Sequence, residues 1–141
     1  MRALLCATSV LVMLLIAGLV TGPAGAQDDE KVPSVKKIMG VLHKGAKGHL
    51  NKVKAALKGD SPDWAEVLKD AKAIAKNGAY LAKNDPPKGD KENWEKLAKA
   101  YASSGKALEE AAEKEDLAKA KAATKKLSTS CKTCHDAHKG D

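Results

Sequence analysis

Residues 117–138 read LAKAKAATKKLSTSCKTCHDAH. Apolar and small side chains recur in this stretch at steps of three and four, which is the period of an amphipathic helix. The stretch ends in a C-x-x-C-H motif formed by Cys131, Cys134 and His135. In a helix, positions i, i+3 and i+4 lie on one face about a turn apart. The spacing therefore predicts a helix that carries two thiols and an imidazole on the same face.

This motif predicts covalent attachment of one haem c. Two thiols a turn apart can add to the two vinyl groups on one edge of a porphyrin, and the adjacent imidazole of His135 can bind the iron. A thioredoxin-like redox pair would need a βαβ unit, which no segment indicates. A disulfide between residues three apart on a helix would be strained. A zinc ion would draw Cys131, Cys134, His135 and His138 from two turns of one helix, whereas tetrahedral sites normally use two segments.

The start of the chain has the pattern of a secretory signal peptide. Arg2 precedes an apolar run from Ala3 to Val20, and Ala24-Gly25-Ala26 offers a small-residue cleavage site. An uncleaved membrane anchor is the alternative, although the run is near the lower length limit for a span. We expect residues 1–26 to be a signal peptide cleaved after about Ala26. Residues 27–141 would then be a four-helix-bundle cytochrome c domain in the periplasm, with no membrane span left.

Composition points to helices and to export. Aromatic residues make up only 3% of the 141 residues and Phe is absent, which argues against an all-β sandwich or barrel. Removal of residues 1–26 takes away the one arginine, Arg2, so the net charge falls from +7 to +6. It also takes away Cys6, which leaves the two motif cysteines as the only ones.

Three further segments have the helical period, and they span residues 33–57, 61–81 and 90–112. Pro33 suits a first helical turn, and Ser61, Asp90 and Asp116 are expected helix N-caps. The strongest break in the chain is Asn84-Asp85-Pro86-Pro87-Lys88-Gly89. Four helices with short connections predict an all-α, antiparallel up-down-up-down four-helix bundle with covalently bound haem.

The second iron ligand is left open by the residues alone. With His135 on one side, the iron of a cytochrome takes Met, His or no protein ligand on the other. Met39, the only methionine after residue 26, lies on the apolar face of the first segment, where a core side chain would also lie. His43, one turn further, is the alternative ligand. We expect His49 at the surface or the haem edge, and His138 in a packing contact.

The apolar faces are unusually small. The region after residue 26 contains 20 alanines, and Gly40, Gly45 and Gly48 interrupt its first segment, each at a cost of about 1 kcal/mol relative to Ala. We expect these glycines to leave room for a large flat cofactor that completes the core. The haem-free protein is therefore expected to be poorly ordered.

The whole region after residue 26 resembles the class II c-type cytochromes, the cytochrome c′ and cytochrome c556 group. In that family a periplasmic four-helix bundle carries C-x-x-C-H near its C-terminus. The segment Ile38-Met39-Gly40-Val41-Leu42 is similar to the first helix of many members, and the resemblance implies that Met39 is the ligand of low-spin members. It also allows a homodimer. In the family an aromatic residue and then a basic residue follow the motif. Here His138 replaces the aromatic residue, Lys139 keeps the basic one, and Val35 stands where members often have Arg.

Three functions follow as hypotheses. The first is a soluble electron carrier, whose positive charge would favour redox partner proteins with acidic docking surfaces. The second is a five-coordinate protein, similar to cytochrome c′, that binds NO or CO. The third is a non-haem helical bundle with a structural or metal-binding role. Nucleic acid is not an expected partner. No paired carboxylates or nucleophile–base pair indicate an enzyme.

Overall fold

The computed structural model describes residues 31–140, and within them every regular element is helical. The predicted signal peptide and its cleavage point lie outside these residues. In chain order the elements are α1 (Val35–His43), η1, a 3₁₀ turn (Gly45–Lys47), α2 (His49–Ala56), α3 (Trp64–Leu81), α4 (Lys91–Glu113) and α5 (Leu117–His138). None of these helices is long and apolar enough to cross a bilayer.

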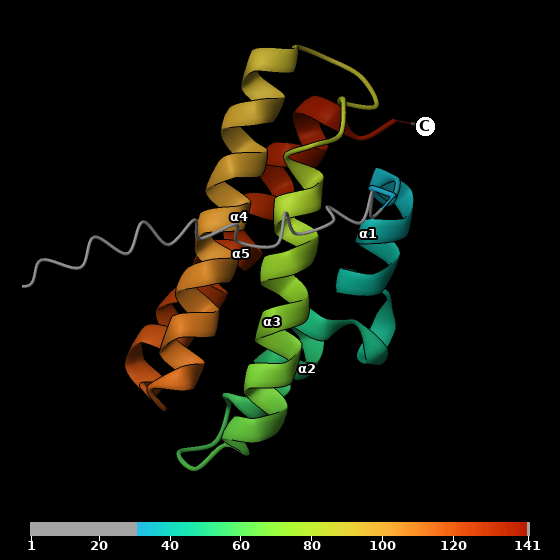
Figure 1. Cartoon of the computed structure of the whole chain (residues 1–141). Coiled ribbons are helices and arrows are strands. Elements are labelled where there is room, and N and C mark those ends of the chain that lie inside the picture. Colours follow the sequence, from blue (N-terminus) through green and yellow to red (C-terminus); the bar gives the residue numbers. More distant parts are fainter. Residues whose placement is uncertain (1–30, 141) are drawn as a thin grey trace, which may run out of the picture. The chain divides into compact units, whose positions relative to one another are not determined.

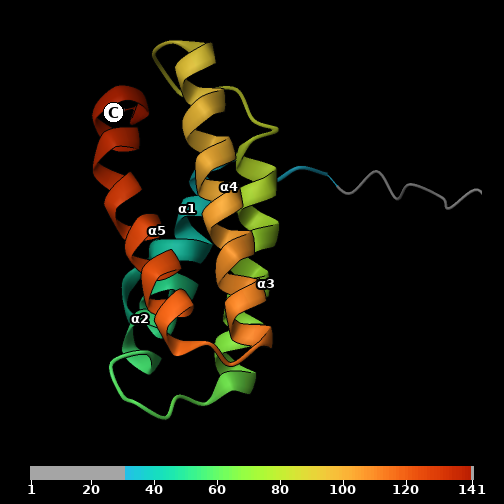
Figure 2. The same cartoon turned by 90° about the vertical axis from the view of Figure 1, so that its left-hand side faces the viewer.

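The helices form an antiparallel bundle. Figures 1 and 2 show α3, α4 and α5 as three long helices of alternating direction, with α1 and α2 in succession taking the place of the fourth. The closest packing joins α3 to α4 and α4 to α5, and both α1 and α2 pack on α3. The all-α, antiparallel four-helix prediction is confirmed.

The first segment is not the continuous helix that its periodicity predicts. Gly45 has a φ of +56°, a conformation that L side chains rarely adopt, and it opens the 3₁₀ turn between α1 and α2. A Cβ at Gly48 would lie 2.8 Å from the carbonyl oxygen of Leu42. The side-chain amide of Asn51 donates to the carbonyl of Gly45 over 2.8 Å. Gly45 and Gly48 therefore let the chain turn upon itself, and room for a cofactor at Gly40, Gly45 and Gly48 stays a prediction.

The helix starts are mostly where the sequence predicts them. Asp90 accepts a hydrogen bond from the backbone N–H of Asn93, and Asp116 accepts one from Lys119, so both predicted caps are confirmed. The cap of α3 is Asp63 rather than Ser61. At the start of α1 the cap is Ser34, and Pro33 precedes the helix.

Small residues bring α3 and α4 close together. A Cβ at Gly78 would lie 3.1 Å from the Cα of Ala102, and one at Gly105 would lie 3.2 Å from the Cα of Ala75. The rest of the core contains few large side chains, of which the largest fully buried are Trp94, Ile38, Leu42, Ile74, Leu81, Leu108 and Leu127. Where α3 and α4 meet through alanine and glycine, the core therefore contains little side-chain volume.

Candidate haem site

The C-x-x-C-H motif lies in the last two turns of α5, as the spacing predicts. Cys131 and Cys134 are free thiols, and both are half-buried. The thiol of Cys131 donates a weak hydrogen bond to the carbonyl of Leu127 over 3.4 Å. His135 is exposed. Burial, with a smaller contribution from Cys131, raises the pKa of the Cys134 thiol.

The motif faces a hollow to which all four long segments of the bundle contribute. We call it the inner hollow, and its lining joins both candidate distal ligands to all three motif residues: Met39, His43, Leu81, Leu97, Tyr101, Ser130, Cys131, Cys134 and His135. Residues from α1, α3, α4 and α5 therefore meet at one place. The five residues singled out from the sequence lie around a single hollow.

A second hollow of about 470 Å³ adjoins the first. We call it the outer hollow, and it is lined by Val35, Lys36, Met39, Pro87, Trp94, Cys134, His135, His138, Lys139 and Gly140. Met39, Cys134 and His135 belong to both linings. Within residues 31–140, α1 packs on α2 and α3 but has no extensive packing against α5. We call the region between α1 and α5, where these two helices do not pack closely, the seam. Both hollows lie along it.

The lining fits a covalently bound haem. It offers two unpaired thiols one turn apart, a neighbouring imidazole, a thioether and mostly apolar walls, which is the donor set that cytochromes use. No group of three or more His, Cys, Asp or Glu side chains within the described part of the chain is arranged to hold a metal ion directly.

His43 and Tyr101 face one another at the inner hollow. Nε2 of His43 lies 3.4 Å from the hydroxyl oxygen of Tyr101. Burial lowers the pKa of His43, and the neighbouring positive charges of His135 and Lys54 lower it further. Burial also raises the pKa of the Tyr101 hydroxyl well above its usual range, with a smaller contribution from Cys131. The hydroxyl therefore keeps its proton beside a neutral imidazole.

Two histidines make contacts that sequence reasoning missed. Nδ1 of His49 lies 2.7 Å from a carboxyl oxygen of Asp70, which is almost completely buried in α3. His49 is thus tied to the bundle while its side chain stays 26% exposed, which is compatible with the expected surface position. His138 is buried and packs edge to face on Trp94, so the expected packing contact is confirmed, but its hydrogen bonds had no signal in the sequence.

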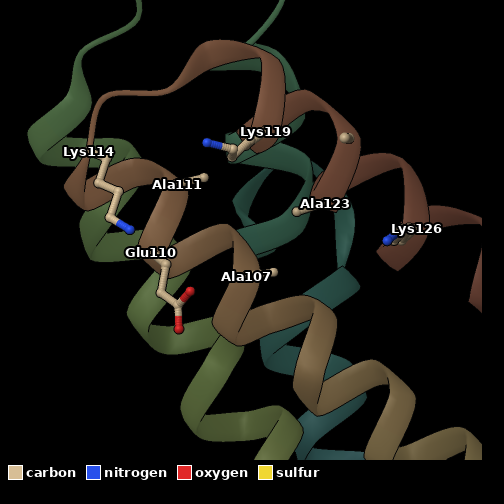
Figure 3. Close-up of a pocket in the computed structure, with 8 residues that line it drawn as sticks. Ala107, Glu110, Ala111, Lys114, Lys119, Ala123 and Lys126 are labelled. Carbon is tan, nitrogen blue, oxygen red and sulfur yellow. The ribbon is translucent and has the colours of Figure 1, made fainter.

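Another groove lies at the far end of α5 from the motif. Figure 3 shows it between the last turns of α4 and the first turns of α5, with Ala107, Ala111 and Ala123 as its floor and lysines at its rim. The amine of Lys119 at this rim is already paired with Asp116 over 2.8 Å. The other charged side chains of the lining are Glu110, Lys114 and Lys126.

The comparisons with known proteins agree with the site. A family model described as Cytochrome C' matches residues 35–139, which include Met39, His43 and the whole motif. No curated protein and no solved structure matches the chain significantly. Members of the matched family are generally non-enzymatic haem proteins, are typically periplasmic and carry one covalently bound haem c. The match spans most of the 141 residues, and the chain therefore belongs to the cytochrome c′ family and is a haem c protein.

Proposed function

We propose that this protein is an exported periplasmic electron carrier with one haem. Cys131 and Cys134 would hold the haem through thioether bonds, and His135 and Met39 would bind its iron. The bound haem supplies a one-electron couple at the iron. The observation that carries the proposal is that the thioether of Met39 lines both hollows together with Cys134 and His135.

Met39 is a better candidate than His43 for the second ligand. Met39 is partly buried against the core and lines both hollows, whereas His43 lines only the inner one. Nε2 of His43 already has the hydroxyl of Tyr101 at 3.4 Å. An imidazole whose free nitrogen accepts a hydrogen bond must give it up to bind iron, and the thioether of Met39 has no such competing partner.

The other residues of the lining exclude water and hold the ligands in place. Leu81 and Leu97 form part of the apolar wall of the inner hollow. Trp94 forms part of the wall of the outer hollow. A rigid iron site with two protein ligands can change oxidation state with little rearrangement, which suits electron transfer. Apolar walls also raise the reduction potential, because water stabilises the more highly charged oxidised form.

We propose acidic redox proteins as the partners. Lys36 and Lys139 are exposed at the rim of the outer hollow, where an electron would enter or leave by the shortest route. Lysines at this rim would steer an acidic surface toward the haem edge. Reversal of both charges (Lys36→Glu with Lys139→Glu) should slow association with an acidic electron donor and reduce its salt dependence. Lys121→Glu, ten residues or about 15 Å before Cys131 on α5, is the control for a charge reversal away from this rim.

The second ligand is tested by absorption and magnetic circular dichroism spectra of the haem-loaded protein. Met39→Leu keeps the volume of the side chain and removes only the thioether. We expect it to convert a low-spin spectrum to a high-spin one and to lower the reduction potential, while His43→Gln leaves both unchanged.

Three outcomes would contradict this proposal. A low-spin spectrum that survives Met39→Leu and disappears in His43→Gln would move the ligand to His43. A wild-type protein that is high-spin when reduced and binds CO or NO at once would favour gas binding. A protein that gains no haem mass in a maturation-competent host would exclude both functions.

A further inference from the structure

His138 is a buried polar residue close to the motif. Its side chain is 2% exposed, and it follows Cys134 by four residues and His135 by three, so it lies one turn beyond both on α5. Its ring meets that of Trp94 edge to face, with the ring centroids 5.3 Å apart. Cys134, Trp94 and His138 line the outer hollow together. His138 is thus part of the wall beside the second thiol.

Both ring nitrogens of His138 have partners from other segments. Nδ1 lies 2.9 Å from the carbonyl oxygen of Lys88, which can only accept, so Nδ1 carries a proton and donates. Nε2 lies 2.8 Å from Oδ1 of the Asn93 side-chain amide. That amide can turn over to donate to a neutral ring or accept from a charged one, so both contacts are compatible with either charge state.

Lys88 belongs to the loop between α3 and α4, residues 82–90, and this loop lies directly on the end of α5. Gly89 has a φ of +82°, and a Cβ there would lie 2.7 Å from the carbonyl oxygen of Ala137 and 3.1 Å from Nδ1 of His138. The loop backbone therefore approaches α5 as closely as only glycine allows. Pro87 of the same loop contributes to the lining of the outer hollow.

The loop is fixed at its other end by a separate hydrogen bond. The indole N–H of Trp94 donates to the carbonyl of Asn84 over 2.7 Å. The side-chain amide of Asn84 in turn donates to the carbonyl of Pro33 over 3.1 Å, just before α1. His138 therefore holds to α5 the end of the loop that carries Pro87 and Lys88.

We infer that His138 is a positioning residue that fastens the 82–90 loop to α5 through the Lys88 carbonyl, and that the fastened loop closes the edge of the haem beside Cys134 to water. The inference uses the haem that the family carries and does not depend on the electron-carrier role. The inference holds equally for a five-coordinate iron without a second protein ligand.

The chain contains its own control for a test by limited proteolysis with trypsin. The tripeptide Lys-Gly-Asp occurs at residues 88–90, at residues 58–60 in the loop between α2 and α3, and at residues 139–141, and the second of these is the control. A Cβ at Gly59 would meet nothing within 4 Å, whereas Gly89 is packed against α5. Trypsin cleaves after lysine in both places. The ratio of the two cleavage rates therefore reports on the loop at residue 88, and thermal melting of the same variants measures any global loss of stability separately.

Three substitutions separate the contacts of His138. His138→Asn places an amide nitrogen near the position of Nδ1 and keeps a donor for the Lys88 carbonyl. His138→Gln places one near Nε2 and keeps only the Asn93 contact. His138→Phe keeps an aromatic ring on Trp94 and loses both hydrogen bonds. The haem-loaded proteins are compared by cleavage rates after Lys88 and Lys58, by haem spectra and by reduction potential.

We expect cleavage after Lys88, relative to Lys58, to rise about two- to tenfold in His138→Gln and His138→Phe and to stay near the wild-type value in His138→Asn. The potential should fall in the first two variants and be retained in the third, because an opened loop admits water to the haem edge. An unchanged cleavage ratio in all three variants would overturn the fastening role. A raised ratio with an unchanged potential would overturn the role in closing the haem edge.

Discussion

Nε2 of His43 lies 3.4 Å from the hydroxyl oxygen of Tyr101, and the two rings meet edge to face with their centroids 6.2 Å apart. Burial raises the pKa of Tyr101, so its hydroxyl keeps its proton and donates. Burial, followed by His135 and Lys54, lowers the pKa of His43 and so favours the neutral ring, whose Nε2 accepts in the tautomer that carries its proton on Nδ1. This side-chain contact between α1 and α4 at the inner hollow thus joins a protonated hydroxyl to a histidine that its burial keeps neutral.

This neutrality predicts a pH dependence of stability. The unfolded chain binds a proton at His43 near pH 6.5, and the folded protein does so only at a lower pH. Protons therefore favour unfolding as the pH falls below about 6.5, and the stability contributed by the neutral ring is fully present only above that value. Urea midpoints measured at pH 7.5 and 5.5 should fall more in the wild type than in His43→Gln. Equal falls in both proteins would contradict the assignment of a neutral ring.

A second prediction concerns the contact between His49 and Asp70. The carboxyl group of Asp70 is almost completely buried, and Nδ1 of His49 is its closest partner at 2.7 Å. His49→Ala leaves that group without this partner and should lower the free energy of unfolding by about 1–3 kcal/mol. The combined change of His49→Ala and Asp70→Leu should cost less than the sum of the single changes. Chemical unfolding of the four proteins gives the coupling energy.

Lys52 provides the control for this contact. Its amine lies 3.9 Å from the same carboxyl oxygen, but its side chain is 45% exposed. Lys52→Ala should therefore change stability by no more than about 0.5 kcal/mol. If Lys52→Ala were as damaging as His49→Ala, the buried carboxyl group would owe its stability to the lysine.

The sequence predicts contacts between residues that are close in the chain and misses contacts between residues that are far apart in it. Asp90 and Asp116 are predictable as caps, because a cap acts on a backbone N–H three residues away. The motif cysteines share a helix face for the same reason. The pairing of His49 with Asp70 joins residues 21 apart, and that of His138 with Lys88 joins residues 50 apart. No periodicity encodes such pairs, since they depend on how the helices are placed.

The break between α1 and α2 was missed for a different reason. Apolar positions continue through it at helical spacing, so the pattern of the first segment predicts one helix. The positive φ of Gly45 overrides that pattern locally, and the apolar side chains on both sides still reach the core: Ile38, Leu42, Leu50 and Val53 are all buried. Periodicity reports which side chains face inward and does not report whether the backbone is continuous.

A third prediction uses two helical glycines in opposite surroundings. A Cβ at Gly78 would lie 3.1 Å from the Cα of Ala102, a backbone atom that cannot move aside cheaply. Overpacking of this kind costs about 1–3 kcal/mol, which exceeds the gain of about 1 kcal/mol from replacing glycine by alanine in a helix. Gly78→Ala should therefore lower the melting temperature. Gly40→Ala, exposed on α1 with nothing within 4 Å of the new Cβ, should raise it. A stabilising Gly78→Ala would mean that α3 and α4 are free to move apart.

The last prediction concerns how the haem is held. Cys131 and Cys134 are free thiols at the wall of the inner hollow, and no other cysteine lies in residues 31–140. In the haem-loaded protein both sulfurs would be thioethers, so a denatured sample should take up no alkylating reagent there. With Cys131→Ala and Cys134→Ala together, any haem retained through His135 should be extracted by acidified solvent.

The same double variant tests whether the haem completes the core. Within residues 31–140, α1 and α5 have no extensive packing on each other, so loss of a haem between them should lower the melting temperature and reduce near-ultraviolet circular dichroism more than the helical signal. Ser130→Ala, which lines the inner hollow beside Cys131 and removes no thiol, is the matched control. A double variant that unfolds as cooperatively and at the same temperature as the haem-loaded protein would show that α1 and α5 close on each other without the haem.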